Sequence, residues 1–72
     1  MITANFAPVI RVAAEDPQLL AERLEAAERQ AQGWAIREGR CGILVTRHTP
    51  TAFTVELHEE VPYGTTRERD FT

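Results

Sequence analysis

The segment GILVTRHTPTAFTVELHEE, residues 42–60, contains the clearest strand pattern of the chain. Apolar and polar residues alternate on both sides of the turn segment TPTA, and this pattern predicts a β-hairpin with strands at 42–48 and 53–59. Successive side chains of a strand point to opposite faces, so the apolar residues can all be buried only if they share one face. The residues of that face are Ile43, Val45, Phe53, Val55 and Leu57.

The other face of the hairpin is mostly polar. It carries Leu44, Thr46, His48, Thr54, Glu56 and His58. His48 is near the hairpin tip, and His58 is about 13–20 Å away along the strands at about 3.3 Å per residue. Zinc ligands lie about 2.0–2.3 Å from one ion, so we expect the two histidines to share no metal, and we expect no other cofactor. Leu44 indicates that this face is covered by the tail, by another subunit or by a partner.

Residues 15–39, EDPQLLAERLEAAERQAQGWAIREG, predict one long helix. Asp16 is suited to the N-cap and Pro17 to the first helical position, where a missing N–H costs nothing. The apolar side chains recur at spacings of three and four, so they share one helix face. They are Leu20, Leu24, Ala27, Ala31 and Trp34.

Two glycines compete for the end of this helix. Gly33 ends it early, or it is tolerated inside the helix at a cost of about 1 kcal/mol and Gly39 is the cap. Trp34 and Ala35 continue the apolar stripe beyond Gly33, so we expect a helix at 17–38. We expect the stripe to pack on the chain's own sheet. The alternative is that its leucines and alanines pair with a helix of a second subunit.

Two further segments complete the expected fold. PVIRVA, residues 8–13, predicts a short strand, whereas VPYGTTRERDFT, residues 61–72, predicts a turn and a loosely held tail. The order β-α-β-β predicts an α+β fold, in which one long helix packs on one face of a small three-stranded, mostly antiparallel sheet. We favour pairing of the first strand with the third, in the order 2-3-1. Pairing of the first strand with the second would give a mixed sheet.

Length and composition restrict the class of protein. A chain of 72 residues makes a single small domain, which buries only about 60% of the surface of its unfolded form. Small domains usually gain stability from a disulfide, a metal or a partner, and Cys41 is the only cysteine. We therefore expect a homodimer or a protein partner. The N-terminus does not resemble a secretory signal, and no apolar run approaches the roughly 18–20 residues of a membrane span, so we expect a cytoplasmic protein without membrane contact.

The sequence predicts a protein that is not an enzyme. It contains no serine, no glycine-rich phosphate loop and no Cys-x-x-Cys pair, and Cys41 has the strand parity of the core residue Ile43. All eight basic residues are arginines, in a chain of net charge −3. Arg37, Arg40 and Arg47 flank the helix–strand connection and the hairpin tip. They form a positive patch if they are gathered on one side, together with the tail arginines, and otherwise each points outward singly, which we favour.

Two functions remain open from these patterns. The first, which we favour, is a protein–protein interaction module that works as a homodimer. The alternative is a small nucleic-acid-associated accessory factor that uses the arginines, although the net charge of −3 is unlike that of general nucleic-acid binders. The candidate interaction surface consists of Leu44, Thr46, His48, Glu56, His58, Arg37, Arg40 and Arg47.

The string GILVTRHTPTAFTVEL, followed by VPYG, resembles short proteins of actinobacteria and their phages. These proteins have a similar GILVTRH strand, an FTV return strand and a VPYG or VPFG turn. The resemblance covers roughly residues 37–70. It implies a small cytoplasmic protein linked to a phage or another mobile element, and it implies no activity and no catalytic residue.

Overall fold

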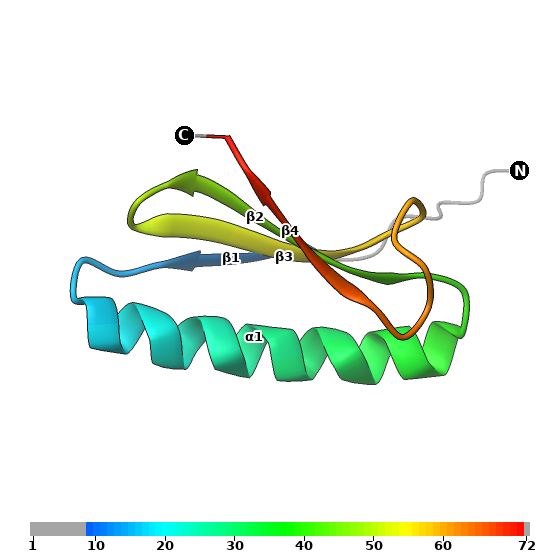
Figure 1. Ribbon diagram of the computed structural model, residues 1–72. Coiled ribbons are helices and arrows are strands. Elements are labelled where there is room, and N and C mark those ends of the chain that lie inside the picture. Colours follow the sequence, from blue (N-terminus) through cyan, green and yellow to red (C-terminus); the bar gives the residue numbers. More distant parts are fainter. Residues whose placement is uncertain (1–8, 72) are drawn as a thin grey trace, which may run out of the picture.

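The computed structural model describes residues 9–71 of the chain. One long helix lies along one face of a twisted sheet (Figure 1). The elements in chain order are β1 (Ile10–Ala13), α1 (Pro17–Glu38), β2 (Gly42–Thr49), β3 (Ala52–His58) and β4 (Thr66–Asp70). The α+β class and the single helix on one face were predicted correctly, whereas the predicted number of strands was wrong.

The helix α1 has the predicted bounds and the predicted N-cap. Asp16 has an extended backbone (φ −82°, ψ 121°), and its side chain accepts a hydrogen bond of 3.4 Å from the Gln18 N–H. At the other end Gly39 adopts the left-handed conformation with φ 67°, and its N–H donates to the Ala35 carbonyl. The helix therefore ends at Gly39, and Gly33 is tolerated within it.

The core lies between α1 and the sheet. Three small residues of the helix, Ala27, Ala31 and Ala35, are buried, and they let the helix approach the strands closely. Facing them are buried aliphatic residues of three strands: Val12, Ile43, Val45, Val55 and Leu57. Burial of each such side chain stabilises the fold by about 1.5–3 kcal/mol relative to exposure. The predicted apolar faces of the helix and of the hairpin are both confirmed.

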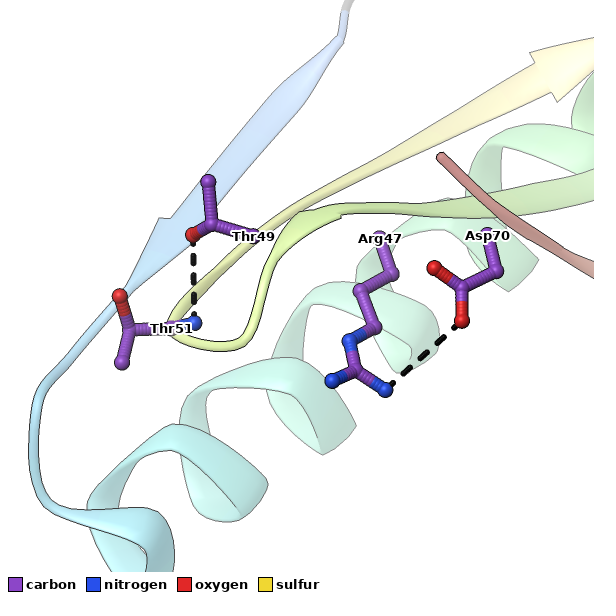
Figure 2. Close-up of polar contacts among 4 residues, drawn as sticks. All are labelled: Arg47, Thr49, Thr51 and Asp70. Atoms are coloured by element: carbon purple, nitrogen blue, oxygen red, sulfur yellow. Dashed lines mark hydrogen bonds and ion pairs between the residues drawn. The ribbon is translucent and has the colours of Figure 1, made fainter. Parts of the chain in front are cut away.

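The hairpin register confirms the predicted faces. Val45 is opposite Val55 on the helix side, and Thr46 is opposite Thr54 on the other side. In the turn, the Thr51 N–H donates to the Thr49 hydroxyl at 3.2 Å, as Figure 2 shows. The strand β1 pairs antiparallel with β3, so the favoured order 2-3-1 is correct for the first three strands. Pro8, the expected start of that strand, lies outside the described residues.

The C-terminal segment corrects the prediction. Residues 66–70 are not a loosely held tail but the strand β4, which pairs parallel with β2. The sheet is therefore mixed and four-stranded, in the order β1-β3-β2-β4. All five residues of β4 are exposed, so burial of apolar side chains does not hold this strand in place. Backbone hydrogen bonds to β2 hold it, and the alternation of apolar residues gave no sign of them.

The turn between β3 and β4 is anchored on the start of β2. Val61 is buried to 2% exposure, and its carbonyl accepts a hydrogen bond of 2.6 Å from the Gly42 N–H. The Ile43 N–H donates to the Thr65 carbonyl at 3.0 Å. A Cβ atom at Gly42 would collide with the carbonyl oxygens of Thr65 and Pro62 and with the Val61 side chain. Gly42 is therefore required where the turn crosses β2.

Candidate interaction surface

The side of the sheet opposite α1 is covered by no described helix, and we call it the open face (Figure 1). Directly paired residues of a sheet point to the same side, so the pairing registers define this face. Its polar, charged and larger apolar members, with the ring that continues β4, are Arg11, Leu44, Thr46, His48, Thr54, Glu56, His58, Arg67, Arg69 and Phe71. The open face thus brings together the five hairpin residues of the predicted surface.

Two members of the predicted surface are not accessible on it. Leu44 is 4% exposed and Thr46 is 2% exposed in the single chain. Leu44 lies between Glu56 of β3 and Arg67 of β4, so the segment expected to be a tail runs directly beside it. Of the three covers that the sequence left open, the chain's own C-terminal segment is sufficient. No second subunit is needed to bury Leu44.

His48 belongs to a small cluster at the hairpin tip. Its Nε2 lies 3.0 Å from the Thr54 hydroxyl, and its ring meets the Phe71 ring edge to face at 5.8 Å between centroids. The Arg69 guanidinium lies 5.5 Å from the Phe71 ring centroid. Phe71 is 60% exposed. His48, Arg69 and Phe71, which we call the tip cluster, present an aromatic ring and a cation to solvent.

His58 lies at the opposite end of the hairpin. It pairs with Gly42 at the start of β2, and its Nδ1 accepts a hydrogen bond of 3.1 Å from the Glu60 N–H. Glu56 lies two residues before His58 on β3, so it shares the same face, and it is half-buried. Within residues 9–71 there is no group of three or more His, Cys, Asp or Glu side chains arranged to hold a metal ion.

Three arginines, Arg11, Arg67 and Arg69, lie on the open face. Arg67 and Arg69 are the tail arginines of the positive patch that the sequence left open as an alternative, whereas Arg11 was not among its candidates. Arg11 pairs with Thr54, Thr54 with Thr46, and Thr46 with Arg69, so one row of the sheet has an arginine at each end. At about 4.8 Å between strands, the backbones of the two arginines are about 14 Å apart. Arg67 lies one row further along β4. All three side chains are exposed.

The other three candidates for that patch, Arg37, Arg40 and Arg47, do not belong to the open face. Arg47 lies on the helix side of the sheet, where its Nη1 is 3.8 Å from the Asp70 carboxylate (Figure 2). Its Nε is buried without a hydrogen-bond partner among the described residues. Arg37 is in the last turn of α1, and Arg40 follows the helix, both exposed. The structure therefore does not gather Arg47 with the arginines of the open face.

Charge is divided between the two sides of the sheet. Among the described strand residues, the open face carries three arginines, two histidines and one carboxylate, that of Glu56. On the helix side Glu68 of β4 faces Glu28 of α1. Partial burial of Glu28 raises the pKa of its carboxyl, with further contributions from Glu68 and Glu25. A groove of about 240 Å³ lies here, lined by Leu24, Val45, Arg47, Phe53, Glu68, Arg69 and Asp70.

The cysteine of the chain belongs to the core and not to the open face. Cys41 is half-buried and packs against the core. None of the helices that the structure describes is long and apolar enough to cross a membrane. What the open face offers chemically is reversible recognition of negative charge by guanidinium groups, which bind carboxylates and phosphates.

Comparison of the chain with protein-family models, with curated proteins and with solved structures gave no match.

Proposed function

We propose that this chain is a non-enzymatic protein-interaction module whose open face binds an acidic surface of a partner protein. One observation carries the proposal: Arg11, Arg67 and Arg69 share the open face with a single described carboxylate, although the whole chain has a net charge of −3. The acidic residues lie mainly on the helix side, in α1 and in the turns. The open face therefore carries an excess of positive charge in an acidic chain, although five of the eight arginines lie elsewhere.

The shape of the open face supports a protein partner. A four-stranded sheet gives a broad surface, and its centre is dry because Leu44 and Thr46 are already buried. The arginines stand at both margins, on β1 and β4, so a partner that covers the sheet would contact both. Arginine is enriched at protein interfaces, where its planar head group forms paired hydrogen bonds with carboxylates.

The homodimer expected from the sequence remains a second form of the same proposal, but it does not follow from the open face. Two copies that met through this face would bring arginines against arginines, and like charges at close range repel. A homodimer would therefore have to use another surface. Sedimentation at micromolar concentration tests whether a homodimer forms, and a strictly monomeric chain would contradict the homodimer.

The tip cluster favours one alternative, which is binding of single-stranded nucleic acid. Phe71 is exposed, and Arg69 and His48 lie beside its ring. Aromatic rings next to arginine are the platforms on which bases stack, at about 1–3 kcal/mol per base. One such ring is less than nucleic-acid-binding sheets usually offer, since two or three bases are stacked on the sheet of a typical RNA-binding domain.

Binding measurements with two probes distinguish these functions. The probes are a glutamate- and aspartate-rich peptide and an oligothymidylate of the same length, each titrated into the full chain at low and at physiological salt. The proposal predicts peptide binding that is insensitive to Phe71→Ala. Binding of the oligothymidylate that is lost in Phe71→Ala, without binding of the peptide, would replace the protein partner by nucleic acid.

A further inference from the structure

The free edge of β4 is a second surface, distinct from the open face. The strand β4 is last in the order β1-β3-β2-β4, and no described strand pairs with its outer side. The Thr65 carbonyl and the Phe71 N–H both bond to β2, so the backbones of the odd-numbered residues point toward β2. Backbone groups alternate in direction along a strand, and the N–H and C=O groups of Thr66 and Glu68 therefore point outward.

The charged side chains of β4 lie on different faces of the sheet according to their sign. Arg67 and Arg69 share the open face, because they pair with Leu44 and Thr46. Glu68 points to the helix side, because it pairs with the core residue Val45. The strand thus presents positive charge above its edge and negative charge below it.

This pattern opposes pairing of β4 with a second copy of itself. Two identical edges related by a two-fold axis run antiparallel, and opposed residues then lie on the same face. With Glu68 opposite its own copy, Arg67 is opposite Arg69 and the glutamates oppose each other. Shifting the register by two residues in either direction places an arginine opposite its own copy. Like charges directly opposite each other destabilise a strand pair, so every register of this kind is unfavourable.

The edge of β1 is protected from pairing with another strand in a different way, by a side chain of α1. The Ala14 N–H bonds to the Thr51 carbonyl across the β1–β3 pair, so by alternation the Ala13 carbonyl points to the outer edge. The Arg23 guanidinium donates a hydrogen bond of 2.9 Å to that carbonyl. A strand added at this edge would have to displace Arg23. Of the two edges of the sheet, β4 is the one at which the outward N–H and C=O groups of Thr66 and Glu68 have no such cover from a described side chain.

We propose that the free edge of β4 accepts an extended segment of a partner protein as a fifth strand, with acidic side chains on the open-face side and basic side chains on the helix side. The acidic side chains would lie beside Arg67 and Arg69. The basic ones would lie beside Glu68 and face Glu28, and neither of these carboxylates has an ion pair with a described basic side chain. Burial and the nearby Glu68 already disfavour the charged form of Glu28, so a cation arriving there is stabilised.

The groove on the helix side gives such a basic side chain room. Leu24, Val45 and Phe53 supply its apolar part, and Glu68 stands at its β4 side. A lysine or arginine can lay its aliphatic stem along apolar surface while its charged head remains at the rim. This proposal rests on the proposed function only in that the partner is a protein. It adds the conformation of the bound segment and the order of its charges.

Amide exchange in the full chain tests the added strand. The probes are two blocked octapeptides of equal composition, one alternating lysine and glutamate and one with four lysines followed by four glutamates. At a concentration ten times its Kd, the alternating peptide should slow exchange at Thr66 and Glu68 about tenfold, since protection scales as 1 + [L]/Kd. The block peptide should protect these amides much less. Equal protection by both peptides, protection at β1 instead, or none up to millimolar peptide would overturn the proposal.

Two variants of Glu68 separate backbone pairing from charge. Glu68→Pro removes an outward N–H, which is the position where an edge strand tolerates proline, and Glu68→Thr removes the same charge but keeps the N–H. Strand addition predicts that the proline variant loses protection at Thr66, whereas the threonine variant keeps most of it. If both variants behave alike, the peptide is held by charge alone and no strand is added. Arg11→Glu lies on the far edge of the sheet and should leave this protection unchanged, so a failure of the edge and a failure of the open face are distinguishable.

Discussion

Arg11 and Arg69, near opposite ends of the chain, occupy the two ends of one row across the open face. Thr54 and Thr46 lie between the two arginines, and each residue of the row pairs directly with the next. This arrangement depends on β4, because Arg69 reaches the open face only when residues 66–70 pair with β2. The attachment of β4 to β2 therefore decides whether the proposed binding surface exists. That attachment depends on the turn between β3 and β4, which crosses β2 at Gly42.

Gly42→Ala should destabilise the fold by about 1–3 kcal/mol, the usual cost of forcing a group into a filled space. The added methyl group meets the Thr65 and Pro62 carbonyls and the Val61 side chain, so the turn must move and β4 loosens. Chemical denaturation gives the free energy, and amide exchange of β4 shows whether that strand responds first.

Gly33→Ala is the matched control for this substitution. Gly33 lies within α1, and a Cβ there meets nothing within 4 Å. Alanine should stabilise the helix by about 0.5–1 kcal/mol. An equal loss of stability in the two variants would show that the crossing of the turn over Gly42 has no special role.

Glu28→Gln should raise the free energy of unfolding at neutral pH by a few tenths of a kcal/mol, because it removes a partly buried charge and its repulsion with Glu68 and Glu25. The pKa of Glu28 is higher in the folded chain than its ordinary value of 4.5. In the pH window between these two values, the folded state therefore binds more protons than the unfolded state. The native chain therefore loses stability from this group as pH rises through the window. The advantage of the glutamine variant should be present above the raised pKa and vanish below 4.5.

Glu22→Gln provides the comparison, since Glu22 is exposed on the same helix. Denaturation curves of both variants at several pH values make the measurement. A gain for Glu28→Gln that does not change with pH, or a gain of the same size for Glu22→Gln, would contradict the repulsion between α1 and β4.

The double variant Arg67→Glu, Glu68→Thr should associate more strongly than the native chain. When two chains pair with position 68 opposite position 68, the first change places the new glutamate of each chain opposite Arg69 of the other. Two pairs of opposite charge then replace two pairs of like charge. The second change removes the central pair of like charges. Cross-strand pairs are worth about 0.2–1 kcal/mol each, so the association constant should rise about tenfold. Sedimentation equilibrium measures it, and no increase would mean that charge does not protect this edge.

The sequence was sufficient for the elements that bury apolar side chains. The helix bounds followed from Asp16, Pro17 and Gly39, and the hairpin faces followed from the alternation of residues 42–58. The strand β4 was missed because TRERD has no apolar residue, and its pairing depends on backbone hydrogen bonds to β2. Its one sequence signal is the alternation of charge sign, which has the period of a strand.

The candidate surface was predictable only in part, for a related reason. Parity alone placed His48, Glu56 and His58 on one side of the hairpin. The partnership of Arg11 with Arg69 requires the strand order, which no local pattern contains. Arg47 was grouped with other arginines by its position near the hairpin tip, but the same parity that puts Val45 in the core turns Arg47 toward α1 and Asp70.

Charge reversal at the two ends of the Arg11–Arg69 row tests the proposed role of the open face directly. The affinity of an acidic peptide for the double variant Arg11→Glu, Arg69→Glu is compared with that for Arg37→Glu, Arg40→Glu, which changes the net charge equally but lies off the open face. Exposed ion pairs are worth about 0.2–1 kcal/mol each, so reversal at both open-face positions should weaken binding about tenfold or more. The control should weaken it much less. Equal weakening by the two double variants would mean that net charge, and not the open face, attracts the partner.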